Sequence, residues 1–506
     1  MPFKNFWSTD FRSSVVVFLV ALPLCLGIAL ASGAPLFSGL LAGIIGGIVI
    51  GSLSGSSVSV SGPAAGLSTI VAAAILDLGS YELFLMSVVL AGIIQMILGF
   101  AKAGAIGRFF PISVIKGMLS AIGLILILKQ IPHAVGYDVD FEGDESFFQS
   151  DGRNTFSEIL AAWDFLSPGA IVISLLSIFI MIQWDTNRFQ RFKFFRLVPS
   201  ALAVVLLGIL LNSLFTNFYP YFAIGEKHLV SLPVFSQSVG ISSLLTFPDF
   251  SGWQNSKVYI TAITIAIVAS LETLLSIEAC DRIDKSHGVT PLNRELKAQG
   301  VGNFLSGLIG GLPVTSVIVR SSANINAGAR SRASAISHGV ILMIAVLLFP
   351  GLLSLIPLSS LAGLLIMVGF KLTKPALYKE MYRKGMSQFF PFIVTILAVV
   401  FTDLLQGVFL GIVVALFFIL KTNFQKAVIF VSSDENYMIR FTKDVSFLHK
   451  NALGEAFEKV PSDSRLLVDG SKAQFMDQDI KEMLVDFTEN AKARNIEVEL
   501  KNIHIN

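Results

Sequence analysis

Long apolar runs dominate the chain up to about residue 424. No charged side chain occurs between positions 13 and 76, and His338 is the only titratable group between positions 333 and 370. Because a transmembrane helix needs about 20 apolar residues, the two runs hold several spans between them. Cutting the apolar runs at charges and at Gly/Pro clusters predicts fourteen segments, at 13–31, 37–54, 61–77, 83–101, 112–131, 168–184, 197–216, 257–279, 289–310, 313–328, 333–354, 358–373, 387–402 and 404–421.

The third and the tenth segments open with the same unusual pattern. Each has an extended lead, a Gly/Pro break and a short helical stretch with small residues, VSVSGPAAG at 58–66 and GGLPVTS at 310–316. The two segments are seven apart, and because seven is odd, the halves of the chain would have opposite orientations in the membrane. This is typical of an inverted-topology repeat.

The remainder of the chain has a different pattern. Charged residues return from about Gln425, with strands expected at 438–442, 465–468 and 496–500 and helices at 447–459 and 480–493. We therefore predict an all-α polytopic membrane domain at 1–424, with fourteen segments in a seven-plus-seven inverted repeat, followed by a small cytoplasmic α/β domain at 425–506.

Composition narrows the class of protein further. Hydrophobic residues make up 54% of the chain and charged residues 14%, against about 25% charged in average soluble domains, and the mean hydropathy is +0.73. The net charge of +2 gives no sign of a nucleic-acid partner. Two cysteines and six scattered histidines predict no disulfide scaffold and no metal or other resident cofactor. The sequence contains neither a Walker lysine loop nor a nucleophile triad, so we do not expect an enzyme. The expected partner is the lipid bilayer.

Loop charges predict the orientation. Cytoplasmic loops are enriched in Lys and Arg, and fourteen crossings from a cytoplasmic N-terminus place the basic loops at 102–116, 188–196, 330–332 and 371–384 inside and the acidic loop at 138–151 outside. Both termini are then cytoplasmic, in the cytoplasmic (inner) membrane of a bacterial-type cell. Lys4 and Arg12 before the first run imitate a signal peptide, but the uncharged stretch continues far beyond one, so we expect it to be retained as the first span.

The two interrupted segments predict an anion site. A half-helix that begins at the bilayer midplane exposes unpaired backbone N–H groups and about half a positive charge. We expect Ala64, Ala65 and Gly66 to start one half-helix and Thr315 and Ser316 the other, with their amino ends facing a shared anion. The alternative is that the Gly/Pro breaks only kink ordinary helices.

Charged residues inside predicted spans are further candidates, because such residues are costly in a bilayer and usually find a partner or face a pathway. Glu272 lies inside the eighth segment, and Ser276 is one turn further on the same face. Together they could hold a coupling Na⁺, or Glu272 could exchange a proton. Arg320 could strengthen the positive potential of the anion site. The structural alternative pairs Glu272 with a helix N-terminus or with Arg320.

These motifs resemble those of the SulP (sulfate permease) anion transporters, which carry a C-terminal STAS domain. The features that match are Leu22-Pro23, Val60-Ser61-Gly62-Pro63, Ser270-Leu271-Glu272, Pro291-Asn293-Arg294-Glu295-Leu296 with Gln299-Gly300 and Gly302-Asn303, and Gly310 to Pro313 with Arg320, Asn324, Ala327 and Gly328. The tail looks like a shortened STAS domain, with Leu466–Asp469 followed by Phe475-Met476-Asp477.

The resemblance implies a core domain that moves against a gate domain, and a homodimer. Carried onto this chain, the family's anion site falls on Leu24, Ile28, Ala64–Gly66, Glu272 and Val314–Ser316 with Arg320. Many family members have a Gln and an aromatic residue where this chain has Leu24 and Ile28. The spacing of Glu272 and Ser276 is similar to the Asp and Thr pair of the sodium-coupled bicarbonate branch.

The leading hypothesis is a secondary active transporter of a small inorganic oxyanion, sulfate or bicarbonate, that works by alternating access with Na⁺ or H⁺ coupling. An anion channel, or a nucleobase or dicarboxylate permease of the same fold, is the alternative.

Overall fold

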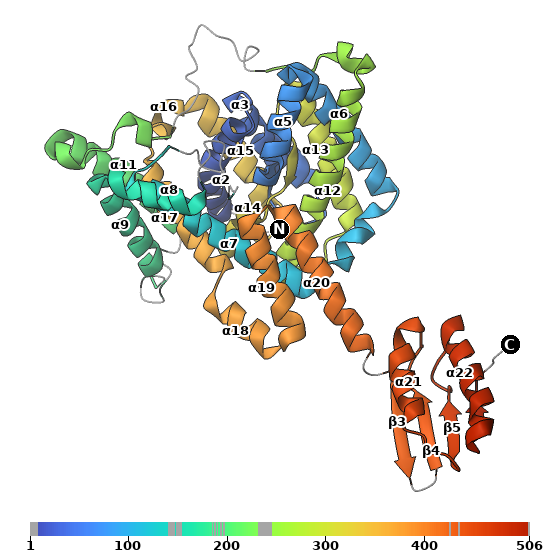
Figure 1. Cartoon of the computed structure of the whole chain (residues 1–506). Helices are drawn as coiled ribbons and strands as arrows, with labels where there is room; N and C mark the ends of the chain where they lie inside the picture. Colours follow the sequence, from blue (N-terminus) through green and yellow to red (C-terminus); the bar gives the residue numbers. More distant parts are fainter. Residues whose placement is uncertain are drawn as a thin grey trace. The chain divides into compact units, whose positions relative to one another are not determined.

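A computed structural model describes residues 9–139, 147, 154–184, 186, 189, 191–192, 195, 198–230, 245–424, 427–433 and 436–503. The chain forms two compact units, Met1–Ile412 and Val413–Asn506, each of which is described by itself (Figure 1). The division falls inside helix α20 (Leu404–Phe424), and the predicted boundary after residue 424 lies between that helix and the first strand of the second unit. Most of the predicted loop charges at 138–151 and 188–196 lie outside the described residues, namely Asp140, Glu142, Asp144, Glu145, Asp151, Arg188, Lys193 and Arg196.

Helices account for nearly all of the first unit. The first half contains α2 (Phe11–Ala31), α3 (Leu36–Ile45) continued by the π-helical turn η2 (Gly46–Ile50) and α4 (Gly51–Leu53), α5 (Ser68–Leu78), α6 (Tyr81–Phe100), α7 (Ile112–Val135), α8 (Thr155–Ala162), α9 (Pro168–Trp184) and α11 (Ser200–Phe218). The second half contains α12 (Ser256–Ile283), α13 (Leu292–Ile309), α14 (Ile318–Asn326), α15 (Ala333–Leu348), α16 (Pro350–Leu353), α17 (Leu358–Leu372), α18 (Pro375–Arg383), α19 (Met386–Phe401) and the start of α20.

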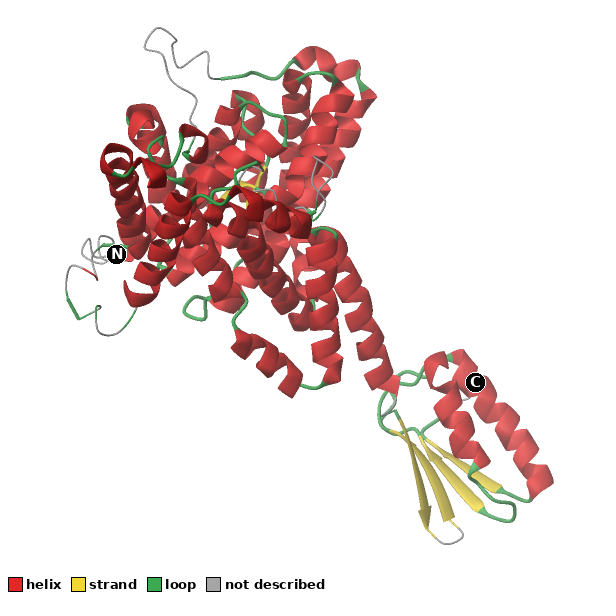
Figure 2. Ribbon diagram, turned by 60° about the vertical axis from the view of Figure 1, so that its left-hand side comes forward, coloured by secondary structure: helices red, strands yellow, loops and turns green. Residues whose placement is uncertain are grey.

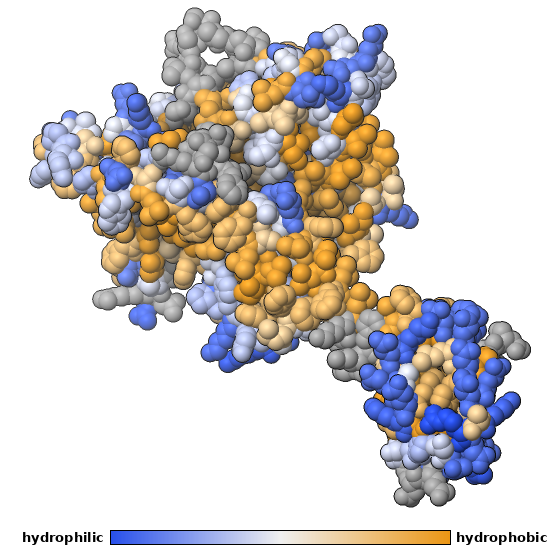
Figure 3. Space-filling model, viewed as in Figure 1, coloured by the Kyte–Doolittle hydropathy of each residue, from blue (hydrophilic) through white to orange (hydrophobic). Residues whose placement is uncertain are grey.

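Every predicted segment contains a helix. Among the described residues, seven helices are long and apolar enough to cross a membrane, or eight when the bent pair Thr155–Phe165 and Pro168–Trp184 is one span. Four shorter apolar helices, Ala65–Leu78, Ala333–Leu348, Met386–Phe401 and Leu404–Leu420, and the more polar α13 and α14 complete the fourteen. Apolar side chains cover the middle of this unit, and hydrophilic ones gather toward its upper and lower margins (Figure 3). The chain is therefore a multi-pass membrane protein.

The helices sort into two packed groups that take members from both halves. In the first group, which we call the core, α2, α3, α5 and α6 pack with α12, α13, α14 and α15. In the second, the gate, α7, α9 and α11 pack with α17, and α19 packs on α7. Glycines allow the closest approaches, as membrane helices require: a Cβ on Gly92 would lie 2.6 Å from the Gly300 carbonyl in the core, and one on Gly123 2.6 Å from the Gly369 carbonyl in the gate. The predicted core and gate architecture is confirmed.

The second unit contains a four-stranded sheet with the order β3-β4-β5-β6, formed by β3 (Val428–Ser433), β4 (Asn436–Phe441), β5 (Arg465–Asp469) and β6 (Glu497–Lys501). β3 and β4 are antiparallel and the other neighbours are parallel. The helices α21 (Lys450–Glu458) and α22 (Gln478–Ala491) contribute the apolar side chains that bury one face of the sheet. The predicted strands and helices are all present, and this small α/β unit fits the expected STAS-like domain. We did not predict β3, which completes the sheet by pairing antiparallel with β4.

Candidate functional site

Two short strands meet at the centre of the core. β1 (Ser61–Pro63) and β2 (Val314–Ser316) pair antiparallel, with Gly62 opposite Thr315, and Figure 2 shows them as a small yellow ladder among the helices. Each strand leads into a helix: β1 into the 3-10 turn η3 (Ala65–Leu67) and α5, and β2 into α14. The predicted pattern of strand, break and half-helix is therefore present in both repeats.

The helix starts differ in part from the prediction. Thr315 and Ser316 do not begin a helix; they lie in β2, and α14 begins at Ile318. Ala64 is also extended, so the first helical turn begins at Ala65. The reason is that pairing between β1 and β2 supplies backbone partners to the extended residues, and β-branched residues such as Thr315 favour extended backbone.

Polar side chains of α13 hold both strands in place. Asn303 accepts a hydrogen bond from the Val314 N–H and donates to the Val314 carbonyl at 2.9 Å, while Gln299 donates to the Ser61 hydroxyl at 2.8 Å. Both amides are completely buried. In the sequence analysis these two residues appear only as part of a family motif. Two amide side chains one turn apart in a predicted span were a signal that could have placed them near the site.

Glu272 and Gly66 are in direct contact. A Cβ on Gly66 would lie 2.0 Å from Glu272 Oε1, so the carboxylate of α12 packs against the first turn after β1. The next residue, Thr273, accepts a hydrogen bond from the Ser316 N–H at 3.2 Å. α12 thus contacts both strand–helix segments. We did not predict the role of Thr273. The available signal was that a second polar side chain directly follows Glu272 inside a predicted span.

Arg320 is the most buried charge of the site. It is 0% exposed, and its Nη2 donates a long hydrogen bond of 3.5 Å to the Pro63 carbonyl, across the interface between the two repeats. Its Nε and Nη1 have no hydrogen-bond partner among the described residues, where no ion pair includes Arg320. The predicted alternative in which Arg320 pairs with Glu272 is therefore wrong. His338 of α15, also 0% exposed, has both ring nitrogens without a hydrogen-bond partner within the described part of the chain.

A cavity of about 490 Å³ separates α5 from the gate. Ala65, Gly66 and Thr69 line its core side, and Ile122 and Ile125 of α7 line the gate side. The link between α19 and α20 closes another wall, with residues 402–406. This link is a polar turn, because the Gln406 N–H donates to Asp403 Oδ1 at 2.9 Å and so caps the start of α20. The cavity is large enough for a small hydrated anion beside the first turn of the half-helix.

The predicted site residues fall into three sets. The cavity contains Ala65 and Gly66, with Glu272 behind them. The paired strands include or adjoin Ala64, Val314, Thr315 and Ser316, and Arg320 donates a hydrogen bond to Pro63 of β1. Ile28 belongs to the same apolar cluster as Val314, whereas Leu24 and Ser276 are buried without a described contact to the other site residues.

Comparison with known proteins agrees with this architecture. Residues 7–395 match the Sulfate permease family. The chain is 25% identical over 447 residues to the bicarbonate transporter BicA of Picosynechococcus, covering 86% of this chain and 74% of that one. It is 24% identical over 371 residues to sulfate transporter 4.1 of Arabidopsis thaliana, covering 72% and 51%. The solved structure of SLC26A9 superposes with a TM-score of 0.68 at 17% identity, over 100% of this chain and 86% of that one. The chain therefore belongs to the sulfate permease family, whose members are membrane transporters of anions and not enzymes.

Proposed function

We propose that this protein is a secondary active transporter that carries sulfate or bicarbonate between the two strand–helix segments by alternating access. The observation that supports this most is Arg320, a completely buried cation without an ion-pair partner among the described residues. A buried charge that lacks a counter-charge costs several kcal/mol. An anion bound next to the paired strands would remove much of that cost.

The backbone adds to the attraction. The first turns of α5 and α14 carry unpaired N–H groups and a partial positive charge, and the small residues Ala65 and Gly66 leave room for an anion to approach. No metal is required for this recognition, since helix N-termini bind oxyanions through backbone N–H groups.

The two packed groups support the proposal of alternating access. The core holds both strand–helix segments, and the cavity beside α5 is bounded on its other walls by the gate. Rocking of the core against the gate would move the anion site from one side of the membrane to the other. We place both termini in the cytoplasm and the protein in the bacterial inner membrane, as a homodimer.

Glu272 is the proposed coupling residue. Its carboxylate lies against Gly66, so a Na⁺ or a proton on Glu272 would change the charge beside the anion site; Ser276 could add an oxygen ligand to Na⁺. We expect Glu272→Gln to abolish ion-coupled uptake in proteoliposomes and to leave exchange of anion down its own gradient. Full gradient-driven uptake by this variant would contradict the assignment.

Uptake of labelled sulfate and labelled bicarbonate into proteoliposomes, with and without a Na⁺ gradient, tests the function directly. We expect saturable uptake of one of these anions that depends on a Na⁺ or H⁺ gradient. Uptake that does not saturate and follows the membrane potential alone would instead indicate a channel.

A further inference from the structure

The cavity beside α5 contains a single charged side chain. Among the thirteen described residues that line it, Asp403 is the one Asp, Glu, Lys, Arg or His. This residue is exposed and lies in the link between α19 and α20. Thr69, Thr402 and Gln406 add neutral polar groups, and the other lining residues are apolar. The wall of the cavity therefore carries negative charge, although the proposed solute is an anion.

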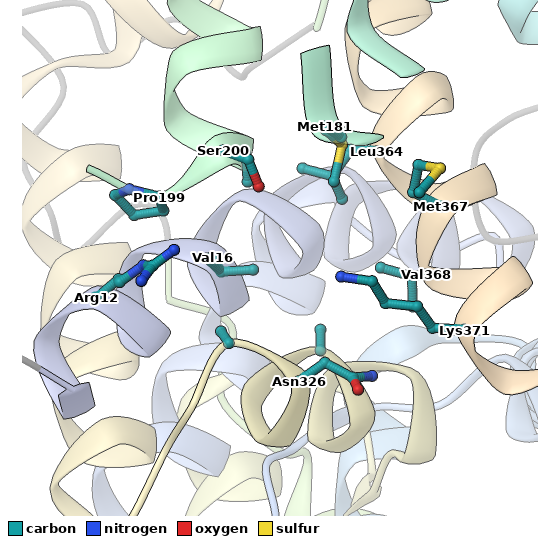
Figure 4. Close-up of a pocket in the computed structure, with 13 residues that line it drawn as sticks. Arg12, Val16, Met181, Pro199, Ser200, Asn326, Leu364, Met367, Val368 and Lys371 are labelled. Carbon is teal, nitrogen blue, oxygen red and sulfur yellow. The ribbon is translucent and has the colours of Figure 1, made fainter. Parts of the chain in front are cut away.

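Positive charge near the boundary of core and gate belongs to a different cavity. Figure 4 shows this second cavity, which has a volume of about 60 Å³ and thirteen lining residues, among them Arg12 of α2 and Lys371 of α17. None of these thirteen residues also lines the cavity beside α5. Arg12 and Lys371 therefore do not belong to the wall that carries Asp403.

The capping role of Asp403 does not account for its charge. Asp403 Oδ1 accepts the hydrogen bond from the Gln406 N–H that caps α20. Asn and Ser cap helices about as well as Asp does, so a neutral side chain would also close this turn. The remaining structural explanation is the dipole of α20, because a helix N-terminus favours a negative charge. That explanation predicts an effect on stability and none on the choice of anion.

A carboxylate at this wall repels anions according to their charge. Coulomb energy is proportional to the product of the two charges, so Asp403 repels a doubly charged oxyanion twice as strongly as a singly charged one at the same position. Apolar walls, which here include Ile122, Ile125 and Leu404, strengthen the field of a charge within a cleft. Removal of an ion from water also costs more for a higher charge, and the cavity offers few polar groups to replace that water. Both effects favour the singly charged anion.

The two charged residues of the proposed site do not have the same effect. Arg320 attracts a doubly charged anion more strongly than a singly charged one, so it favours the opposite choice. Glu272 lies against Gly66 but is not one of the lining residues, and in the proposed function a Na⁺ or a proton neutralises its charge. Asp403 is therefore the charge at the cavity wall that opposes a doubly charged solute.

We infer that Asp403 is a specificity-determining residue, which makes the cavity favour oxyanions with one negative charge, such as bicarbonate, over those with two, such as sulfate. The inference rests on the proposed function, in which the anion passes through this cavity to reach the strand–helix segments. Asp403 acts through its charge and needs no direct bond to the anion. Its effect therefore depends on the charge of the anion and not on the shape of the anion.

Competition in proteoliposomes tests this inference. Uptake of labelled bicarbonate is measured at about pH 8 and constant ionic strength in gluconate, with sulfate or nitrate as the competitor; nitrate is singly charged and planar like bicarbonate. For the unaltered protein we expect a half-inhibiting concentration about tenfold or more higher for sulfate than for nitrate. Asp403→Asn keeps the cap and removes the charge. Because the repulsion is twice as large for sulfate, the half-inhibiting concentration should fall about tenfold for sulfate and about threefold for nitrate in this variant.

Two further variants serve as controls. Asp403→Glu retains the charge on a side chain that is not among the preferred helix caps, and it should keep the preference for nitrate. Asp249→Asn removes an equal charge from another exposed cap, before the 3-10 turn η9 (Phe250–Gln254), where Asp249 Oδ1 accepts from the Ser251 N–H at 2.8 Å outside the cavity. It should behave like the unaltered protein. Loss of the preference in Asp403→Glu, or an equal gain for sulfate in Asp249→Asn, would contradict a charge effect at this cavity.

The remaining outcomes separate this inference from the proposed function. Saturable uptake with the same half-inhibiting concentrations in the unaltered protein and in Asp403→Asn would overturn the inference alone, and a lower melting temperature of that variant would then assign Asp403 to the stability of α20. Sulfate that competes as well as nitrate against the unaltered protein would also overturn it. If the unaltered protein shows no saturable uptake of bicarbonate or of sulfate, the proposed function is wrong, and the inference that rests on it fails for that reason.

Discussion

The two strand–helix segments share one backbone pattern but lie in different surroundings. The first turn after β1 borders a cavity of about 490 Å³, and on α5 Leu76 is 83% exposed. α14 is enclosed by the core, and its residues from Ile318 to Asn324 are all buried. One repeat therefore presents its half-helix to the gate, while the other holds a buried cation in the interior.

This difference shows how two repeats with the same backbone pattern can carry different functional side chains. Glu272 packs against the β1 segment and Arg320 belongs to the β2 segment, whose guanidinium reaches back to Pro63 of β1. Among the ion pairs of the described residues, none joins this carboxylate to this guanidinium. In the proposed function, a negative solute would respond to Arg320 and a cation would respond to Glu272.

The largest expected effect concerns the contact between Gly66 and Glu272. Gly66→Ala places a Cβ 2.0 Å from Glu272 Oε1, so the carboxylate or the helix start must move, and displacements of about 1 Å at a reacting site can cost roughly 100-fold. We expect a loss of uptake of about that size in proteoliposomes. Gly288→Ala is the control, because a Cβ there meets nothing within 4 Å; equal uptake by the two variants would show that the contact is unimportant.

Removal of the buried cation should have the next largest effect. Arg320→Gln loses the charge that is proposed to attract the anion, and hydrogen bonds to charged groups contribute about 1.5–3 kcal/mol. We expect a ten- to hundredfold higher half-saturating anion concentration, measured as initial uptake rates. The exposed Arg108→Gln removes an equal charge outside the site and should not change this concentration; an unchanged affinity in Arg320→Gln would leave Arg320 a structural role only.

The side chains of α13 that hold the two strands should contribute unequally to stability. Asn303→Ala leaves the buried N–H and carbonyl of Val314 without their side-chain partner, at about 1–3 kcal/mol for each unsatisfied group. Gln299→Ala removes a bond to the Ser61 side chain and leaves the backbone of β1 paired. Thermal unfolding should show a larger destabilisation for Asn303→Ala, and the reverse order would contradict the unequal supports.

We expect the smallest effect, a pH-dependent change in stability, from residues after the end of α7. The middle turns of this helix face α5 across the cavity. Burial raises the pKa of Asp138, but hydrogen bonds with His133 and His228 outweigh this and bring that pKa below its usual value. The hydrogen bond with Asp138 raises the pKa of His228. This ion pair therefore stabilises the fold fully below the ordinary histidine pKa, and the contribution disappears as the pH rises through the raised pKa of His228.

His228→Gln tests this pH dependence. Because the His228 side chain is 34% exposed, solvent screening limits the contribution to below about 1 kcal/mol. We expect His228→Gln to lower the melting temperature slightly at pH 6 and not at pH 9. An equal difference at both pH values would mean that the histidine charge does not stabilise this contact.

The sequence was informative wherever a pattern is local. The uncharged run from 13 to 76 predicted several spans, and the Gly/Pro breaks at 62–66 and 310–313 predicted the two interrupted segments. The carboxylate of Glu272 in the middle of a span predicted a buried acidic residue. The sequence failed where partners come from distant segments. Strand pairing placed Thr315 in β2 instead of a helix, and the support of Val314 by Asn303 depends on how α13 lies beside the strands.

Hydrophobic periodicity and charge alone determined that this chain spans a membrane many times and repeats itself with opposite orientation. They also determined that a small α/β unit follows the last span. The reason is that burial of apolar residues and the cost of charge in lipid act on each segment separately. Only the tertiary structure decided that Arg320 donates a hydrogen bond to the Pro63 carbonyl, that Gly66 contacts the Glu272 carboxylate, and that Arg12 and Lys371 line one cavity. These contacts join residues far apart in the sequence, and their geometry depends on how helices pack, which no local pattern specifies.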